Sequence, residues 1–102
     1  MKKRLIHINK YNPEPIVELL QEQYPEELVL AQKLKKCVLG EWLNPAYICF
    51  VSNRTQYVSN CIMLYDRENK TIVIDVLEDG EIRGIEFFAN LRQLIKNTDR
   101  EK

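Results

Sequence analysis

Carboxylates are the groups in this chain whose number and spacing could support chemistry. Residues 66–86 hold seven of them against three basic residues, a local charge of −4 (3 − 7). Acidic side chains at this density can bind a cation, supply a general acid and base, or face a basic partner. The run Asp75, Glu78, Asp79 does not have calcium-loop spacing, so we expect a partner-binding surface. An ordinary solvated hairpin face is the alternative. The candidate binding residues are Asp66, Glu68, Glu78, Asp79, Glu81 and Glu86.

Residues 33–58 carry the opposite charge, with four basic residues against one acid, a net charge of +3 (4 − 1). Lysines in the second half of a helix are also what the helix dipole favours. This segment is nevertheless a second candidate surface, suited to an acidic partner. Its basic residues are Lys33, Lys35, Lys36 and Arg54.

Nucleophilic catalysis has little support in the sequence. His7 is the only histidine, so a multi-histidine metal site is excluded, and a Cys–His pair would need an exposed cysteine beside His7. Cys37, Cys49 and Cys61 lie in apolar runs without Cys-x-x-Cys spacing, which predicts buried free thiols in a reducing cytosol. A Cys49–Cys61 disulfide between neighbouring strands is the alternative.

Phosphate binding has no glycine-rich loop to support it. The three glycines have structural explanations instead: Gly40 as a helix cap, Gly80 in a turn and Gly84 at a bulge. We therefore expect no enzyme, no cofactor and no metal site.

The elements that must position these residues begin with a helical pair over residues 12–40. Asn12 can cap the first helix, and Pro13 fits its first position. Pro25 interrupts the pattern and starts a second helix, for which Gly40 is a plausible C-terminal cap. The predicted buried stripe of that helix is Leu28, Ala31, Leu34, Val38 and Trp42.

The second half of the chain predicts an antiparallel sheet. Short connections favour a four-stranded meander. Asp79-Gly80 is typical of a type I′ turn, and a bulge at Arg83-Gly84 would place Ile82, Ile85 and Phe87 inward. In the third strand the likelier core face is Ile72, Ile74 and Val76. The predicted strands are residues 47–51, 58–65, 71–77 and 81–87, and a fifth could form at 4–8.

A short C-terminal helix is predicted after Asn90, from the spacing of Leu91, Leu94 and Ile95, and residues 97–102 should fray. The chain of 102 residues suits a single α+β domain, residues 1–102, with the two N-terminal helices packed on the sheet. Its net charge of zero argues against direct nucleic-acid binding. No apolar run suits a signal peptide or a membrane span, which predicts a cytoplasmic location and no membrane partner.

Residues 71–90, TIVIDVLEDGEIRGIEFFAN, resemble the C-terminal signature of a widespread family of small bacterial proteins of unknown function. In that family a strand leads into an acidic Asp-Gly hairpin and a Gly-Ile-Glu strand. The resemblance implies a neighbouring gene for a small toxin-like protein, and it implies no catalytic residue. In size and in its lack of catalytic groups, the whole chain also resembles bacterial immunity proteins.

These observations favour an immunity protein or antitoxin that neutralises a cognate protein toxin, which we expect to be a nuclease. A nuclease cleft is basic because it binds a polyanion, so the acidic hairpin could enter it. The alternative is a structural or regulatory protein that binds another protein, or further copies of itself, through its sheet. Aromatic residues on the outer sheet face would then form the interface. The aromatic candidates are Trp42, Tyr47, Tyr57, Tyr65, Phe87 and Phe88.

Overall fold

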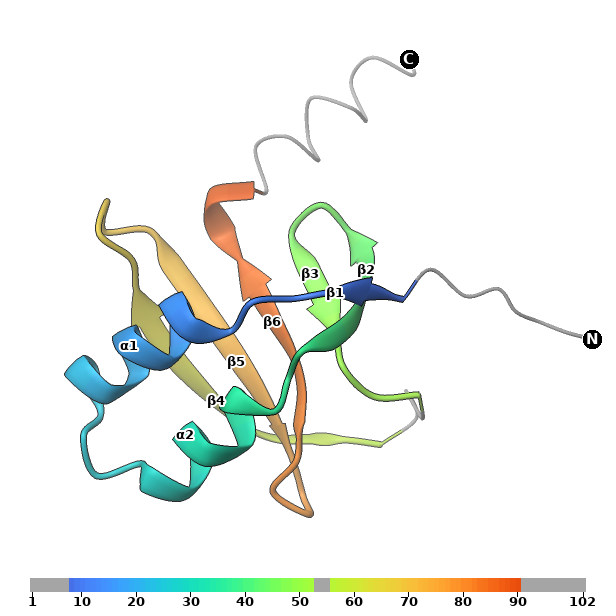
Figure 1. The fold of residues 1–102 in the computed structure, drawn as a ribbon, viewed down its shortest axis with the longest axis horizontal. Coiled ribbons are helices and arrows are strands. Elements are labelled where there is room, and N and C mark those ends of the chain that lie inside the picture. Colours follow the sequence, from blue (N-terminus) through green and yellow to red (C-terminus); the bar gives the residue numbers. More distant parts are fainter. Residues whose placement is uncertain (1–7, 53–55, 91–102) are drawn as a thin grey trace, which may run out of the picture.

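The computed structural model describes residues 8–52 and 56–90. These residues form two helices and one antiparallel sheet, so the predicted α+β class is confirmed (Figure 1). The elements are β1 (Asn9–Lys10), α1 (Glu14–Gln23), α2 (Leu28–Lys35), β2 (Leu39–Asn44), β3 (Tyr47–Cys49), β4 (Val58–Tyr65), β5 (Thr71–Leu77), β6 (Ile82–Phe87) and the 3-10 turn η1 (Phe88–Asn90).

The sheet has the strand order β1-β2-β3-β6-β5-β4. The meander of β4, β5 and β6 is confirmed. The prediction that β3 belongs to the same meander is wrong, because β3 pairs with β6, and both β6 and β5 lie between β3 and β4. The connection from β3 to β4, residues 50–57, is long enough to pass the β5–β6 hairpin, and the free edge of β6 accepts β3 there.

A strand that the sequence reading missed, β2, precedes β3. The second helix was expected to end at Gly40, but α2 ends at Lys35 and Gly40 lies in β2 opposite Asn9. Glycine is needed at that point for packing, because an added Cβ would lie 2.8 Å from the Ile48 side chain. A tight turn joins β2 to β3, and Asn44 Oδ1 accepts the Ala46 N–H at 2.7 Å.

The two helices begin later than predicted. Asn12 Oδ1 accepts the Glu14 N–H at 3.1 Å, so Asn12 supports the helix start, but Pro13 occupies the N-cap position. Residues 25–27 form a turn in which Glu27 N–H donates to Tyr24 O, and α2 begins only at Leu28.

The predicted stripe of the second helix is only partly correct. Ala31 and Leu34 are buried. Leu28 and Val38 are 70% and 48% exposed, because the helix starts at Leu28 and has ended before Val38.

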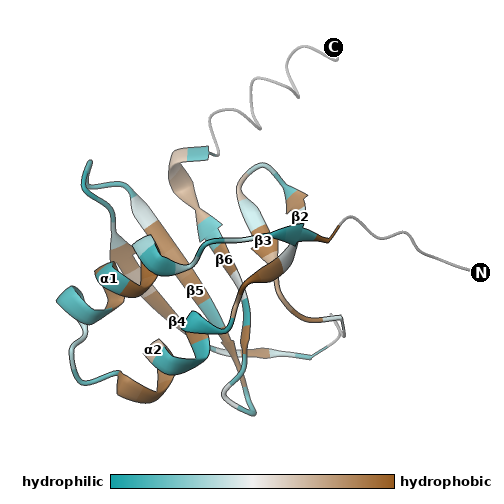
Figure 2. Cartoon of the chain, viewed as in Figure 1, coloured by the Kyte–Doolittle hydropathy of each residue, from teal (hydrophilic) through white to brown (hydrophobic). Residues whose placement is uncertain are grey.

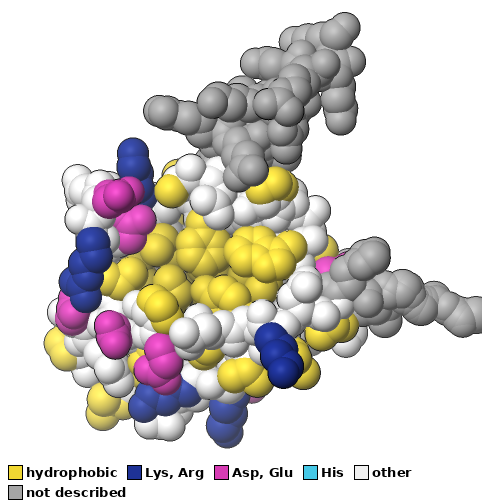
Figure 3. All heavy atoms as spheres, turned by 45° about the horizontal axis from the view of Figure 1, so that its top comes forward, with side chains coloured by type: hydrophobic (Ala, Val, Ile, Leu, Met, Phe, Trp, Pro, Cys, Tyr) yellow, Lys and Arg dark blue, Asp and Glu magenta, His cyan; other side chains and the backbone are white. Residues whose placement is uncertain are grey.

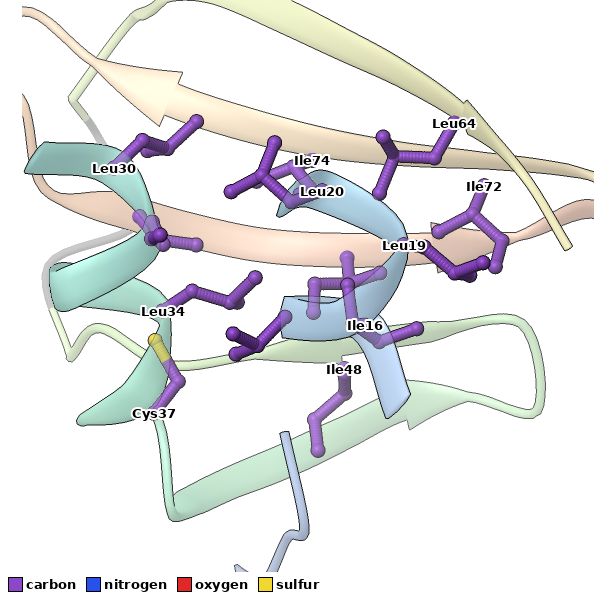
Figure 4. Packing of buried hydrophobic residues seen from close by; sticks show 14 residues of the cluster. Ile16, Leu19, Leu20, Leu30, Leu34, Cys37, Ile48, Leu64, Ile72 and Ile74 are labelled. Atoms are coloured by element: carbon purple, nitrogen blue, oxygen red, sulfur yellow. The ribbon is translucent and has the colours of Figure 1, made fainter. Parts of the chain in front are cut away.

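The core lies between the helices and one face of the sheet. Figure 2 shows hydrophobic residues along both helices and the central strands, and in Figure 4 the apolar side chains of α1 and α2 point toward the sheet. On β5 the predicted core face is confirmed, with Ile72 and Ile74 buried and Val76 packed against the cluster. Other members of the cluster are Ile16, Val17, Leu19, Leu20, Leu30, Ala31, Leu34, Cys37, Ile48, Leu64, Ile82 and Ile85.

The predicted bulge in β6 is confirmed. Ile82 pairs with Val76 and Gly84 pairs with Asp75, so Arg83 is the extra residue. Ile82 and Ile85 are consequently both buried, although strict alternation would place them on opposite faces.

Both hairpins of the meander use a three-residue loop. Gly80 N–H donates to Leu77 O at 2.9 Å, and Asn69 N–H donates to Asp66 O at 2.9 Å. Gly80 has φ +88° and Asn69 has φ +66°. The predicted type I′ turn is wrong because it needs positive φ at Asp79 as well, and Asp79 has none.

Several predictions lie outside the described residues. These are residues 4–7 of the fifth strand, His7, the C-terminal helix after Asn90, and the fraying of 97–102. Ile8 is described and is not part of a strand; β1 follows it. None of the helices in the described part of the chain is long and apolar enough to span a membrane.

Candidate functional site

The six acidic candidates do not form one surface. Asp66 and Glu68 lie in the loop from β4 to β5, whereas Glu78, Asp79 and Glu81 lie between β5 and β6. These loops are at opposite ends of β5, as Figure 1 shows. Seven residues of strand, about 20 Å, therefore separate the two groups.

Some of these carboxylates have local structural partners. Asp66 Oδ1 accepts the N–H groups of Glu68 and Lys70 at 2.9 and 2.8 Å. Asp79 Oδ1 accepts the Glu81 N–H at 3.0 Å. Asp66 and Asp79 thus stabilise their own loops, which leaves less of the predicted acidic surface for a partner.

One basic candidate, Lys33, contacts an acidic one. Lys33 Nζ lies 3.1 Å from Glu81 Oε2, which ties α2 to the β5–β6 loop. Arg54 lies outside the described residues, while Lys35 and Lys36 are exposed. The basic helix therefore faces partly toward the protein's own acidic loop.

A polar network occupies the sheet face opposite α1 and α2, here called the helix-free face because neither helix of the described residues covers it. Tyr47 Oη donates to Asp75 Oδ2 at 3.0 Å, and Arg83 Nη1 donates to Tyr47 Oη at 2.7 Å. Cys61 Sγ donates to Asp75 Oδ1 at 3.3 Å. Glu86, the sixth acidic candidate, pairs with Tyr47 and Val73 in the sheet and adds negative charge to this face.

The chemistry of this network opposes nucleophilic catalysis. Burial, reinforced by the Asp75 charge, raises the pKa of Tyr47 above its ordinary value. Partial desolvation and the hydrogen bond to Asp75 raise the pKa of Cys61 as well. Both groups are therefore held in their protonated forms at neutral pH, in which they are weak nucleophiles.

The three cysteines are free thiols. Cys37 and Cys49 are buried as predicted, but the prediction for Cys61 is wrong because it lies exposed on edge strand β4. Cys49 and Cys61 are not neighbours. They lie in one row across β3, β6, β5 and β4, three strand spacings or about 14 Å apart, too far for a disulfide.

An aromatic cluster lies on the helix side of the sheet. We call Tyr11, Trp42, Phe50 and Phe87 the Trp42 cluster. The Trp42 ring lies edge-on to Tyr11 at 6.4 Å between centroids and tilted against Phe87 at 5.8 Å, and Tyr11 lies 5.5 Å from Phe50. Burial raises the pKa of Tyr11 to about 12.

Trp42 is the exposed member at the centre of this cluster. It is 37% exposed, while Tyr11, Phe50 and Phe87 are half-buried against the core. Figure 3 shows hydrophobic side chains gathered in the middle of the face turned forward, with charged side chains at its rim. A partly exposed tryptophan that packs against two rings, one of which packs against a third, is a rigid, largely apolar surface.

Trp42 and Phe87 are both among the aromatic candidates predicted from the sequence, but their contact was not predicted. Tyr57 and Tyr65 are 86% and 47% exposed, and Phe88 is 43% exposed, whereas Tyr47 is buried in the polar network. The cluster depends on β2, the missed strand, which brings Trp42 next to Phe87.

An acidic stripe on α1 was also missed. Glu14, Glu18 and Glu22 recur every four residues on the exposed side of the helix. The acidic stripe could have been predicted from this four-residue spacing, which is visible in the sequence. Arg67 neutralises its C-terminal end, with two hydrogen bonds of 2.8 Å to Glu22, and these bonds lower the pKa of Glu22.

Comparisons of the chain with protein-family models, curated proteins and solved structures found no match. The resemblance of residues 71–90 to a small bacterial family therefore stays a prediction. Among the described residues no group of three or more His, Cys, Asp or Glu side chains is arranged to hold a metal ion.

Proposed function

We propose that this protein is a non-enzymatic inhibitor, an immunity protein or antitoxin, that binds and neutralises a cognate bacterial toxin. The observation that carries the proposal is the Trp42 cluster. Tryptophan and tyrosine are the residues that most often dominate binding energy, especially when neighbouring rings hold them in place. A rigid aromatic surface also loses little entropy on binding.

The acidic groups would then contribute to the rate and specificity of association. Glu41 and Glu86 directly precede Trp42 and Phe87 in the chain, but they lie in the rows of Cys49 and Tyr47 on the other face of the sheet. On the helix side, Glu14 is close to the cluster along the chain, because it follows Tyr11 by only three residues. Three residues span at most about 11 Å. Negative charge beside an apolar anchor suits a basic partner surface such as the cleft of a nuclease.

Self-association through the sheet edge has less support. The long exposed edge belongs to β4, and its outward groups at Met63 and Tyr65 already bind side chains from the end of α1. A second copy would have to displace these bonds before it could pair there.

The test is to co-express the protein with the product of the neighbouring gene and to measure cell survival and the dissociation constant of the purified pair. Trp42→Ala should weaken binding by about 30-fold or more, equivalent to about 2 kcal/mol. Leu43→Ala is the matched control. Leu43 is the next residue of β2 and is similarly exposed at 40%, but it is not one of the rings of the Trp42 cluster.

Two outcomes would contradict different parts of the proposal. A Trp42→Ala variant that binds as well as the wild type would remove the Trp42 cluster from the interface. A neighbouring gene product that is neither toxic nor bound by the wild-type protein would contradict the inhibitor function itself.

A further inference from the structure

Strand β4 forms the long open edge of the sheet. It has eight residues, Val58–Tyr65, and none of them carries a charge. Met63 and Tyr65 are 46% and 47% exposed. A long, uncharged edge strand is a template for pairing with another strand, and proteins commonly protect such edges with charged side chains. This edge lacks that protection, so another feature must supply it.

The end of α1 supplies side chains that replace a neighbouring strand. Gln23 Nε2 donates to Tyr65 O at 2.8 Å, and Tyr65 N–H donates to Gln23 Oε1 at 3.0 Å. One side-chain amide thus satisfies both outward groups of Tyr65, as a strand would. Tyr24 Oη donates to Met63 O at 2.9 Å, two residues earlier on the same edge.

A third contact continues the series. Glu22 accepts both hydrogen bonds from Arg67, two residues beyond Tyr65. Residues 22, 23 and 24 therefore contact residues 67, 65 and 63 in antiparallel order. We call Glu22, Gln23 and Tyr24 the edge clamp.

The first half of β4 is blocked in a different way. Its pairing with β5 shifts between Val58 and Asn60, so the edge bends there. Asn60 Oδ1 accepts the Cys61 N–H at 2.9 Å, which occupies one more backbone donor. The straight, pairing-competent part of the edge is thus the part that the edge clamp covers.

We propose that the β4 edge is a latent strand-addition site that the edge clamp keeps closed, and that its occupant after release is β4 of a second copy. An uncharged strand does not repel its own copy. Antiparallel pairing of two identical edges has two-fold symmetry and closes after one partner, which yields a dimer rather than a fibre. The clamp accordingly keeps the chain monomeric and leaves the Trp42 cluster as the surface for a different protein.

The experiment compares the full-length wild type with the double variant Gln23→Ala/Tyr24→Phe. The double variant removes all three hydrogen bonds to the backbone of β4 but keeps the Tyr24 ring. Gln21→Ala is the matched control, because Gln21 is an exposed glutamine on the same helix. Light scattering after size-exclusion chromatography gives the mass at increasing protein concentration.

We expect the wild type and Gln21→Ala to stay monomeric, and the double variant to reach twice the monomer mass as concentration rises. At low concentration, where the variant is monomeric, its Tyr65 amide should exchange with solvent about tenfold faster than in the wild type. If the double variant does not fold, the single variant Tyr24→Phe, which frees only Met63 O, should show a weaker shift toward dimer.

A folded double variant that stays monomeric at every concentration would overturn the proposal, as would a wild type that already dimerises through β4. A dimer that survives Met63→Pro in the double variant would also overturn it, because proline removes a backbone donor from the edge. The proposed inhibitor function is independent of these results, since it rests on the Trp42 cluster.

Discussion

Tyr47 lies across the sheet only because residue 84 has no side chain. A Cβ on Gly84 would lie 2.5 Å from both Tyr47 Oη and Ile48 O, so the Tyr47 ring passes directly over the glycine. The hydroxyl can then reach Asp75, and the Arg83 guanidinium lies 5.5 Å from the ring centroid. The bulge at Arg83 and the glycine that follows it therefore serve the same contact on the helix-free face.

Cys37 gives the protein a dependence of stability on alkaline pH. Burial, with a further contribution from the Glu81 charge, raises the pKa of the Cys37 thiol from 9.0 to about 11. A raised pKa means that the folded state holds the proton more tightly, so this contribution is complete below pH 9 and is lost as pH rises toward 11. We predict that the free energy of unfolding falls over this range.

Urea titrations at pH 8, 9, 10 and 11 would measure this slope, with Cys37→Ala for comparison. The variant should be less stable at pH 8, because it leaves a small cavity, and should lose less stability between pH 9 and 11. Equal slopes for both proteins would show that Cys37 does not titrate as described.

At the scale of elements, local patterns predicted β4, β5 and β6 closely. The alternation of apolar and polar residues and the turn residues of these strands are local features of the sequence. Even the bulge in β6 followed from the spacing of Ile82 and Ile85. The choice of which strands pair is different, because it depends on strand edges that are far apart in the chain. The pairing of β3 with β6 therefore could not be read from local spacing.

The errors about the candidate site have the same origin. Trp42 continues the four-residue spacing of Leu34 and Val38, which is typical of a helix stripe. The pairing of Gly40 with Asn9 shows instead that this segment is strand β2. The separation of the acidic residues into two distant loops could have been predicted from the sequence. Successive turns of a meander lie at opposite ends of the strand they share, so Asp66 and Asp79 could not be neighbours.

The β5–β6 loop requires glycine at its third position. Gly80 has φ +88°, and an added Cβ would meet only the flexible end of Lys33 at 3.1 Å, so strain rather than a clash decides the outcome. We predict that Gly80→Ala lowers the free energy of unfolding by about 1–2 kcal/mol. Denaturant unfolding monitored by circular dichroism provides the measurement.

Asn69→Gly is the comparison for this prediction, because Asn69 holds the equivalent position of the other hairpin with φ +66°. Glycine adopts that conformation without strain, so this variant should stay within about 1 kcal/mol of the wild type. If Gly80→Ala proved as stable as Asn69→Gly, the left-handed conformation at residue 80 would not limit stability.

On the scale of the whole molecule, a net charge of zero conceals an uneven distribution. Glu14 and Glu18 lie on α1, close in the chain to Tyr11 of the Trp42 cluster. Glu78 lies at the end of β5 that is farther from the cluster, since Phe87 pairs with Ile72 at the other end. The α1 stripe and the β5–β6 loop are thus separate acidic regions, and the stripe is the one that follows Tyr11 of the proposed anchor closely in the chain.

Charge reversal can decide which region guides a partner. We predict that Glu14→Lys/Glu18→Lys slows association with the proposed partner, the product of the neighbouring gene, whereas Glu78→Lys has a smaller effect. The physical reason is that a charge steers a partner most when it lies beside the contact surface. Glu78 suits the comparison better than Asp79 or Glu81, because those two residues hold their loop together or pair with Lys33. Stopped-flow association rates at low salt give the difference, which should shrink as salt screens charges beyond about 10 Å. A larger effect from Glu78→Lys would instead identify the β5–β6 loop, part of the acidic surface expected from the sequence, as the region that contacts the proposed partner.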